Sequence, residues 1–509
     1  MSQDIAANNK RIAKNTLLLY FRMILLVAVK LYTSRVILIA LGVQDYGIYT
    51  AVGGIVAMFS VLTGSLSTAI SRFITYELGK NDMNRLRLTF SNSVNVLLLF
   101  GLIIIIASET VGLWFLNTKM NIPEGSISAA NIVFQFSIAT FLVNFLSIPY
   151  NALIIAHEKM SAFAYISILE VLLQLLMVFV LFLSSNNRLA LYSAFIFLIA
   201  VVLRSIYGIY CGRNFAESKY QFGIDRTASK ELMSFAGWNL MGASAWVLNT
   251  QGVNLLTNIF FNVFVNAARG VVGQIEAALT MFVNNFITAI VPQITKSFSV
   301  NDMKRFNSLV INGTIFSAYI VGLLAIPLLI EMDGILSLWL KEVPEYASIF
   351  AKVTVISIMF HVLGNILHQA VCAVGEVKRY QILISLTTLF IFILTWAFYA
   401  LGYPPVTYYI INAVIYFIVI FVRLYCLSRE CAFKVTTFIS SIGKVCIVWI
   451  LSLILSCFVS TLMNPSFIRI VATCIVNGIG LCILAFTIGI SKEQRALCVT
   501  KIQKLLCKK

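Results

Sequence analysis

Charged residues are scarce in this sequence of 509 residues, and acidic ones are the rarer kind. Asp, Glu, Lys and Arg make up 11% of the chain, against roughly 25% in a soluble globular protein. There are 20 acidic residues against 37 Lys and Arg, and 60% of the chain is hydrophobic. Because a helix that spans a bilayer needs about 20 mostly apolar residues, this composition excludes a soluble multidomain enzyme and indicates a polytopic membrane protein.

Motifs for metal binding and catalysis are also missing. The ten Cys form no C-x-x-C pair, and most lie in apolar runs, as small core residues do. No G-x-S-x-G motif occurs, and the longest predicted loops have only about 20 residues. The basic residues are scattered through short loops, whereas nucleic-acid binding needs a basic folded surface. We therefore expect no enzymatic activity, no metal site, no cofactor and no nucleic-acid partner.

Apolar runs separated by Gly, Pro, Asn or charged residues predict an all-α fold of about fourteen transmembrane helices. The predicted ranges are 15–40, 46–77, 90–116, 128–156, 160–184, 189–211, 231–262, 264–296, 306–331, 346–374, 379–401, 406–427, 440–462 and 466–490. An even number of spans puts both termini on the same side of the membrane.

Basic residues in the short loops predict which side that is. One set of loops, together with both tails, holds 24 Lys and Arg, and the other set holds only Lys119, Arg188 and Lys341. Because Lys and Arg accumulate in cytoplasmic loops, both termini are predicted to be cytoplasmic. The tail from Ser491 to Lys509 alternates apolar and basic residues at helical spacing, which indicates either an amphipathic helix on the inner leaflet or a solvated basic segment.

An internal repeat divides the chain. An offset of 220 residues aligns 45–90 with 265–310 at 13 identical positions out of 46, including an N-D-M-x-R motif at Asn81 and again at Asn301. The offset spans six helices, so both copies have the same orientation, as in transporters built from parallel repeats. We predict an N-terminal lobe (1–222, helices 1–6), a C-terminal lobe (223–435, helices 7–12) and an additional segment (436–509) with helices 13–14 and the basic amphipathic tail.

The first predicted helix carries three cations, Arg22, Lys30 and Arg35, and no acidic residue between Arg11 and Gln44. A cation at the centre of a bilayer costs about 2.5–3.5 kcal/mol on insertion scales. We therefore expect this helix to border a water-filled lumen. Arg72, near the inner end of the second helix, fits either the mouth of that lumen or an anchor at the membrane surface.

Helices 7 and 8 carry polar residues at helical spacing. On helix 7 these include Asn239, Trp246, Thr250 and Asn254, and on helix 8 Arg269 and Glu276. Such stripes line aqueous lumens, although Asn and Thr also join transmembrane helices. Arg269 and Glu276 lie seven residues apart on one face, so they fit either an ion pair or separate lumen groups.

The remaining charged residues within the predicted spans have explanations that need no lumen. Arg204, Arg423 and Lys444 lie near predicted cytoplasmic ends, and Lys352 and Arg469 near outer ends, where long side chains reach the membrane surface. Glu109, Glu170, Glu276 and Glu331 leave coupling to protons or sodium ions open. His361 and His368 share one helix face and fit a titrating pair or neutral hydrogen-bonding groups.

A lumen lined by cations, amides and an aromatic side chain suits an anion that carries many hydroxyls. The repeat, the segment SRVILIALGVQDYGIYTAVGGIV (Ser34–Val56) and the segment IPYNALIIAHEKM (Ile148–Met160) resemble Wzx-type polysaccharide and O-antigen flippases. These belong to the multidrug/oligosaccharidyl-lipid/polysaccharide exporter superfamily. The resemblance covers essentially the whole chain.

The resemblance implies a two-lobed protein of the bacterial inner membrane that flips undecaprenyl-diphosphate-linked oligosaccharide, a precursor of lipopolysaccharide, capsule or exopolysaccharide, by alternating access. It implies membrane lipids as surroundings and glycan polymerase and glycosyltransferases as partners. The alternative is an ion-coupled multidrug antiporter of the same superfamily. Members that export drugs use an acidic residue in helix 1, which this sequence lacks, and this disfavours the alternative.

Overall fold

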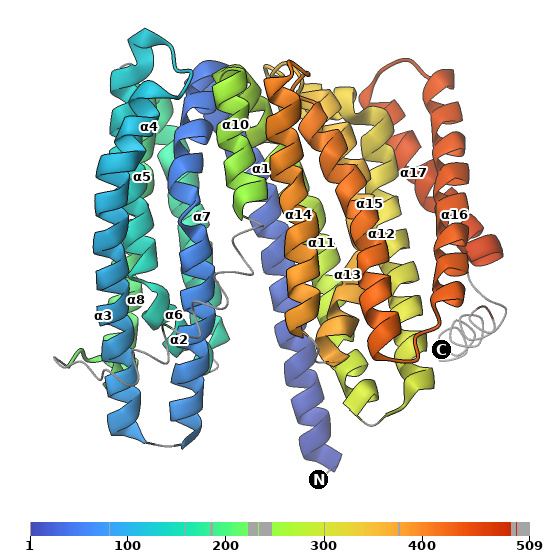
Figure 1. Cartoon of the computed structure of the whole chain (residues 1–509), viewed down its shortest axis with the longest axis horizontal. Coiled ribbons are helices and arrows are strands. Elements are labelled where there is room, and N and C mark those ends of the chain that lie inside the picture. Colours follow the sequence, from blue (N-terminus) through green and yellow to red (C-terminus); the bar gives the residue numbers. More distant parts are fainter. Residues whose placement is uncertain are drawn as a thin grey trace. The chain divides into compact units, whose positions relative to one another are not determined.

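A computed structural model describes residues 2–80, 82–157, 159–183, 187–221, 233, 247–299, 301–374, 377–489 and 495. Within these ranges nearly every residue is helical, and no strand occurs (Figure 1). Ten of the described helices are long and apolar enough to cross a membrane. The prediction of an all-α, multi-pass membrane protein is therefore confirmed.

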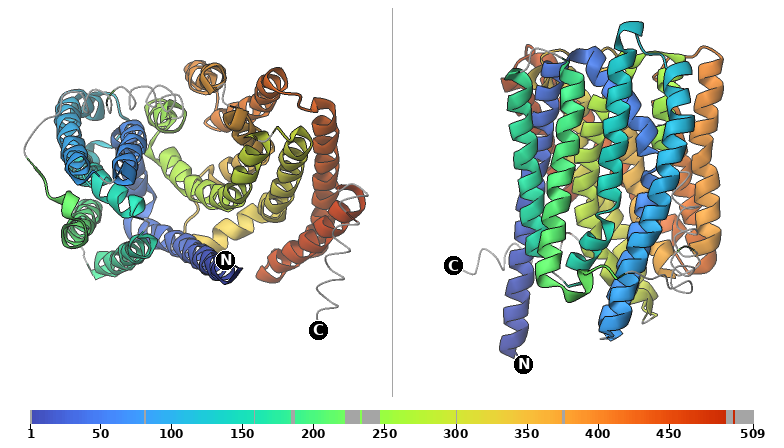
Figure 2. Two further views of the ribbon diagram at one scale, coloured as in Figure 1. Left: turned by 90° about the horizontal axis from the view of Figure 1, so that it is seen from below. Right: turned by 90° about the vertical axis from the view of Figure 1, so that its left-hand side faces the viewer.

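The helices form two compact units, Met1–Gly270 and Val271–Lys509. In each unit they run side by side as a bundle (Figures 1 and 2). The division at residues 222 and 435 and the parallel repeat stay predictions. One local likeness supports the repeat: Asp82 and Asp302 cap α3 (Met83–Ala107) and α12 (Met303–Trp339) in the same way, each accepting from the backbone N–H three residues later.

The first unit begins with α1 (Ser2–Ala57), which is kinked at Gly42. This glycine has φ 79°, a left-handed value that other residues rarely adopt, and it falls between the two predicted ranges 15–40 and 46–77. The unit continues with α2 (Ser60–Lys80), α3, α4 (Leu113–Thr118), α5 (Ile127–Phe145), α6 (Ile148–Ala156), α7 (Met160–Leu183), α8 (Arg188–Asn214), α10 (Val253–Phe260) and the first turns of α11 (Val263–Ser299).

Close helix packing holds this unit together. The rings of Phe90 on α3 and Tyr150 on α6 meet edge to face at 5.2 Å, beside the fully buried Phe145. Because lipid tails are as apolar as these side chains, the stabilisation comes from packing more than from exclusion of water. Gly47 shows how tight the packing is: a Cβ atom there would collide with the Val263 backbone carbonyl of α11.

The second unit contains the rest of α11, α12, α13 (Ala347–Val374), α14 (Val377–Ala400), α15 (Thr407–Glu430), α16 (Val435–Leu462) and α17 (Phe467–Leu484), whose last turns continue to Gly489. Buried hydrogen bonds attach the last two helices to α12. Trp449 Nε1 donates to the Ala318 carbonyl at 3.2 Å, and Asn477 Nδ2 donates to the Leu323 carbonyl at 3.1 Å. Ser452 donates to Asn477 Oδ1 at 2.8 Å.

The predicted helix ranges agree with the described helices, with informative differences. The predicted helix 306–331 ends where α12 is kinked, at Glu331, and a further helical segment continues to Trp339. The predicted helix 128–156 is interrupted between α5 and α6, just before Pro149. Of the predicted helix 231–262, only Met233 and the part from Val247 onward lie among the described residues, and the basic tail lies outside them apart from Arg495.

Candidate substrate-binding site

The structure describes the side chains of only some of the residues predicted to line the lumen. Three of them lie on described helices, but their side chains lie outside the description: Arg22, Lys30 and Arg72. Two others, Asn239 and Trp246, lie outside the described residues altogether. The side chains that the structure does place are those of Arg35, Thr250, Asn254, Arg269 and Glu276.

Arg35 is exposed on α1. Among the described residues the structure gives its guanidinium no hydrogen bond and no ion pair. A guanidinium without a partner has to stay in water or among lipid headgroups, because burying it in hydrocarbon is costly. The exposed position of Arg35 is consistent with that cost. By contrast Arg188, which begins α8, is committed: its Nη1 donates to the Ala40 carbonyl at 3.0 Å, beside the kink of α1.

A buried network joins α1, α10 and α11 within the first unit. Asn254 Nδ2 donates to the Thr50 carbonyl at 3.0 Å. Asn266, fully buried on α11, donates to Asn254 Oδ1 at 2.7 Å and to the Asn254 carbonyl at 2.9 Å. Gly54 on α1 leaves room for the Asn254 amide, which a Cβ atom there would meet. In this structure Asn254 joins helices, as amides commonly do in membrane proteins.

Arg269 and Thr250 meet at the edge of this network. A π-helical turn, Leu248–Gly252, precedes α10, and such turns loosen the regular backbone bonding and are frequent at functional sites. Arg269 Nη2 donates to the Thr250 carbonyl in this turn at 3.3 Å. One edge of the half-buried guanidinium is therefore used to hold the turn. Glu276, in the second unit, is exposed on α11 and acts electrostatically on the Tyr416 phenol of α15.

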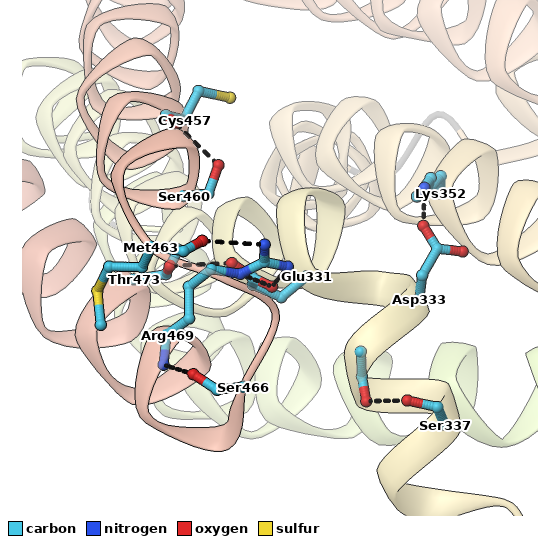
Figure 3. Close-up of polar contacts among 11 residues, drawn as sticks. Glu331, Asp333, Ser337, Lys352, Cys457, Ser460, Met463, Ser466, Arg469 and Thr473 are labelled. Carbon is cyan, nitrogen blue, oxygen red and sulfur yellow. Dashed lines mark hydrogen bonds and ion pairs between the residues drawn. The ribbon is translucent and has the colours of Figure 1, made fainter.

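Arg469, which was predicted to reach the membrane surface, is held in an ion pair. Figure 3 shows its guanidinium on α17 directed at Glu331 of α12, with Nη2 at 2.7 Å and Nε at 3.1 Å from Oε2. Thr473 donates to the other carboxylate oxygen at 3.1 Å, and Glu331 is only 1% exposed. The partners are 138 residues apart, so no local pattern in the sequence reveals the pair. Glu331 is thus an anchor for α17 in this structure.

Lys352 is also paired. Its Nζ lies 2.6 Å from Asp333 Oδ2, and both side chains remain partly exposed (Figure 3). The pair joins α12 to α13 where the two helices are connected. Arg204, a further cation predicted to reach the surface, places its guanidinium 3.9 Å from the centre of the Tyr150 ring, within cation–π range.

Arg423 departs furthest from its predicted environment. It is only 7% exposed, inside the second unit. It donates to the Tyr380 hydroxyl of α14, which lies 2.7 Å from His368 Nδ1, while its Nε has no partner in the described structure. Gly364 of α13 makes the room, because a Cβ atom there would lie 2.8 Å from Arg423 Nη1. His361 and His368 both contact neighbouring helices, since His361 packs edge to face on Tyr416.

The first unit also holds an open cavity with polar and apolar lining that no sequence pattern predicted. It has a volume of about 230 Å³ and lies between α1, α5 and α8, with Tyr49, Ser137 and Asn144 in its lining. The three helices are distant in sequence, so no single segment shows the cavity. The one local signal is the spacing of Ser137, Thr140 and Asn144 on α5, which puts all three on one helix face.

Comparisons with known proteins agree with this fold. Residues 12–298 match the family model described as "Polysaccharide biosynthesis protein". The chain is similar to the "Uncharacterized membrane protein EpsK" of Bacillus subtilis (strain 168), with 20% identity over 284 residues, 55% of this chain and 56% of the relative. The match thus spans about half the length of that curated relative.

Two solved structures show the likeness in three dimensions. One is described as "Lipid II flippase MurJ, inward closed conformation", with a TM-score of 0.71 and 13% identity, covering 92% of this chain and 97% of that chain. The other is the inward-facing conformation of a multidrug resistance MATE family transporter of the MOP superfamily, with a TM-score of 0.60 and 13% identity, covering 79% and 95%. At such low identity these matches show the fold alone.

Proposed function

Because the chain belongs to the polysaccharide biosynthesis protein family, we propose that it is a transporter and not an enzyme, and that it flips an undecaprenyl-diphosphate-linked oligosaccharide across the bacterial inner membrane. The observation that carries the proposal is the family match itself, which covers more than half of the chain and includes the basic helix α1. The sugar part and the lipid diphosphate are the substrate, and both termini are cytoplasmic.

The mechanism follows from charge. Arg22, Lys30 and Arg35 on α1 supply positive charge to the diphosphate as the head group crosses, while the lipid tail stays in the bilayer. Arg35 is exposed and has no partner among the described residues, which supports this role. Outward movement of an anion is downhill when the cytoplasm is negative, by about 2.3 kcal/mol per charge per 100 mV, or about 5 kcal/mol for two charges.

The first prediction concerns these cations. In a strain whose surface glycan depends on this protein, Lys30→Ala and Arg22→Ala are expected to abolish surface glycan, because the diphosphate loses its counter-charge in the membrane. Lipid-linked oligosaccharide should accumulate in the inner leaflet, measured by labelling inverted vesicles and intact cells. Lys30→Arg keeps the charge and should retain export.

Lys14→Ala is the matched control, since it removes the same charge from the same helix on the predicted cytoplasmic side. All variants are compared at equal amounts of protein in the membrane. Wild-type glycan levels in both Lys30→Ala and Arg22→Ala would refute the role of these cations. Glycan that persists after deletion of the gene would refute the proposed function itself.

The second candidate is an ion-coupled multidrug antiporter. It is favoured by the structural likeness to the MATE transporter and by the exposed carboxylate of Glu276 on α11, a group that can carry a proton or bind a sodium ion. The two functions are distinguished by growth on ethidium. Raised resistance on expression, lost in Glu276→Gln, together with unchanged surface glycan on deletion, would favour the antiporter.

A further inference from the structure

The cavity in the first unit is large enough for a small ligand. Its volume of about 230 Å³ far exceeds the roughly 10–15 Å³ that one water molecule needs, and it is of the scale of a single sugar ring. Its polar and aromatic lining comes from Tyr49 on α1, from Ser137, Thr140, Phe141 and Asn144 on α5, and from Ser193 on α8. Every residue of the lining is uncharged.

Two of these side chains have unused hydrogen-bonding capacity. Among the described residues, the Ser137 hydroxyl and the Asn144 amide have no hydrogen-bond partner, and Asn144 is exposed. Thr140 and Ser193 donate to carbonyls of their own helices, at 2.7 Å to Phe136 and at 2.9 Å to Ala190. Their oxygens still have lone pairs that accept. The cavity therefore offers at least one amide and several hydroxyls to a ligand.

The aromatic part of the lining is held in place by its neighbours. The Tyr49 ring packs edge to face on Tyr192, with centroids 4.7 Å apart and planes at 72°, and the two phenols are hydrogen-bonded to each other. Phe141 stacks on Phe145, with centroids 5.6 Å apart. Fixed aromatic faces beside hydroxyls and an amide suit a molecule that has apolar C–H faces and a rim of hydroxyls, as a sugar ring has.

We propose that this cavity binds one uncharged sugar ring of the transported oligosaccharide, an inference that rests on the proposed function. A charged group would find no side chain of opposite charge in the lining. A hard cation would lack the carboxylate oxygens that such ions prefer. An apolar drug would use neither the Ser137 hydroxyl nor the Asn144 amide. The diphosphate is held elsewhere, by the cations of α1, so that the head group is recognised in two chemically separate parts.

The test is saturation-transfer NMR on the purified full-length protein in detergent. The probes are methyl glucoside and N-acetylglucosamine, with glucuronate and inorganic phosphate as charged comparisons. The neutral sugars should receive saturation from the wild type, and the charged probes should not compete with them. Ser137→Ala and Asn144→Leu should each weaken neutral-sugar binding by about three- to tenfold, the loss that corresponds to about one net hydrogen bond.

Ser205→Ala is the matched control. Ser205 lies on α8 and is exposed, and its hydroxyl donates to the Val201 carbonyl of its own helix at 2.8 Å. This variant should bind the sugars as the wild type does, and Ser137→Thr, which keeps the hydroxyl, should retain binding. Absence of saturation transfer from any neutral sugar, or equal binding by the wild type and both cavity variants, would overturn the inference.

Export separates this inference from the proposed function. Ser137→Ala and Asn144→Leu should reduce surface glycan at low expression, in parallel with their weaker binding, whereas Lys30→Ala should abolish it. If the cavity variants export like the wild type while Lys30→Ala does not, the sugar site is wrong and the flippase function stands. If deletion of the gene leaves glycan intact while the cavity still binds neutral sugars, the proposed function fails.

Discussion

The two compact units use their polar side chains differently. In the first unit Arg35, Ser137 and Asn144 have no hydrogen-bond partner among the described residues. In the second unit Arg469 and Lys352 are each held by a carboxylate. A group without a partner binds a ligand without first breaking a contact, whereas a paired buried charge holds helices together. Among the residues compared, the unpaired groups of the first unit are accessible to a ligand, whereas the ion pairs of the second unit hold neighbouring helices together.

Arg423 is an exception among the cations of the second unit. It is buried in the second unit like Arg469, yet it donates to the Tyr380 hydroxyl and pairs with no carboxylate in the described structure. Burial alone therefore does not show that a cation is structural. What distinguishes the two arginines is the partner, so removing each charge in turn should destabilise the protein to different extents.

The largest effect is expected at the ion pair of α12 and α17. Glu331→Gln leaves the Arg469 guanidinium buried without a carboxylate, which should destabilise the protein by about 3–5 kcal/mol. The measurement is unfolding of the purified protein in detergent. The double variant Glu331→Gln, Arg469→Met should regain most of the loss, because no buried charge remains unpaired.

The same experiment contrasts the two arginines. Arg469→Met should be as destabilising as Glu331→Gln. Arg423→Met should lower the free energy of unfolding by at most about 1 kcal/mol, because it leaves no carboxylate without a partner and removes about one hydrogen bond. Equal destabilisation by both substitutions would show that the presence of a carboxylate does not distinguish them.

A smaller effect is expected in the buried network of the first unit. Asn266→Ala removes two hydrogen bonds to Asn254 and leaves buried oxygens without a donor, which should cost about 1–3 kcal/mol in the same unfolding measurement. The control is Asn214→Ala at the exposed end of α8, where the amide donates to the Tyr210 carbonyl. A cost no greater than that of the control would mean that the network contributes little to stability.

The smallest effect is expected at Lys352. Lys352→Met should change the free energy of unfolding by only about 0.2–1 kcal/mol, because exposed ion pairs are screened by solvent and cost side-chain entropy. Raising the salt concentration should weaken the wild type and leave the variant nearly unchanged. A loss as large as that of Glu331→Gln would place this pair among the buried anchors.

The fold could be predicted largely from the sequence, because spans follow from apolar length and from interruptions that are local. The kink at Gly42 and the matching caps at Asp82 and Asp302 lie where glycine, or the N-D-M-x-R motif, marks them. The predicted lumen stays a prediction, and the structure shows only the surroundings of some of its residues. Arg35 proved exposed, whereas Asn254 proved to join helices and Arg469 to be paired.

The sequence by itself determined that this is an all-α membrane protein, since composition and apolar run length decide which segments enter a bilayer. It also showed which helix carries unbalanced positive charge. Only the tertiary structure decided which charges are free and where polar groups converge. Glu331 and Arg469, like the three helices around the cavity, are distant in the chain and are brought together by helix packing. A bilayer favours apolar residues along the whole length of a spanning helix, but it does not specify which helices contact each other. Those contacts decide which polar groups remain available to a substrate.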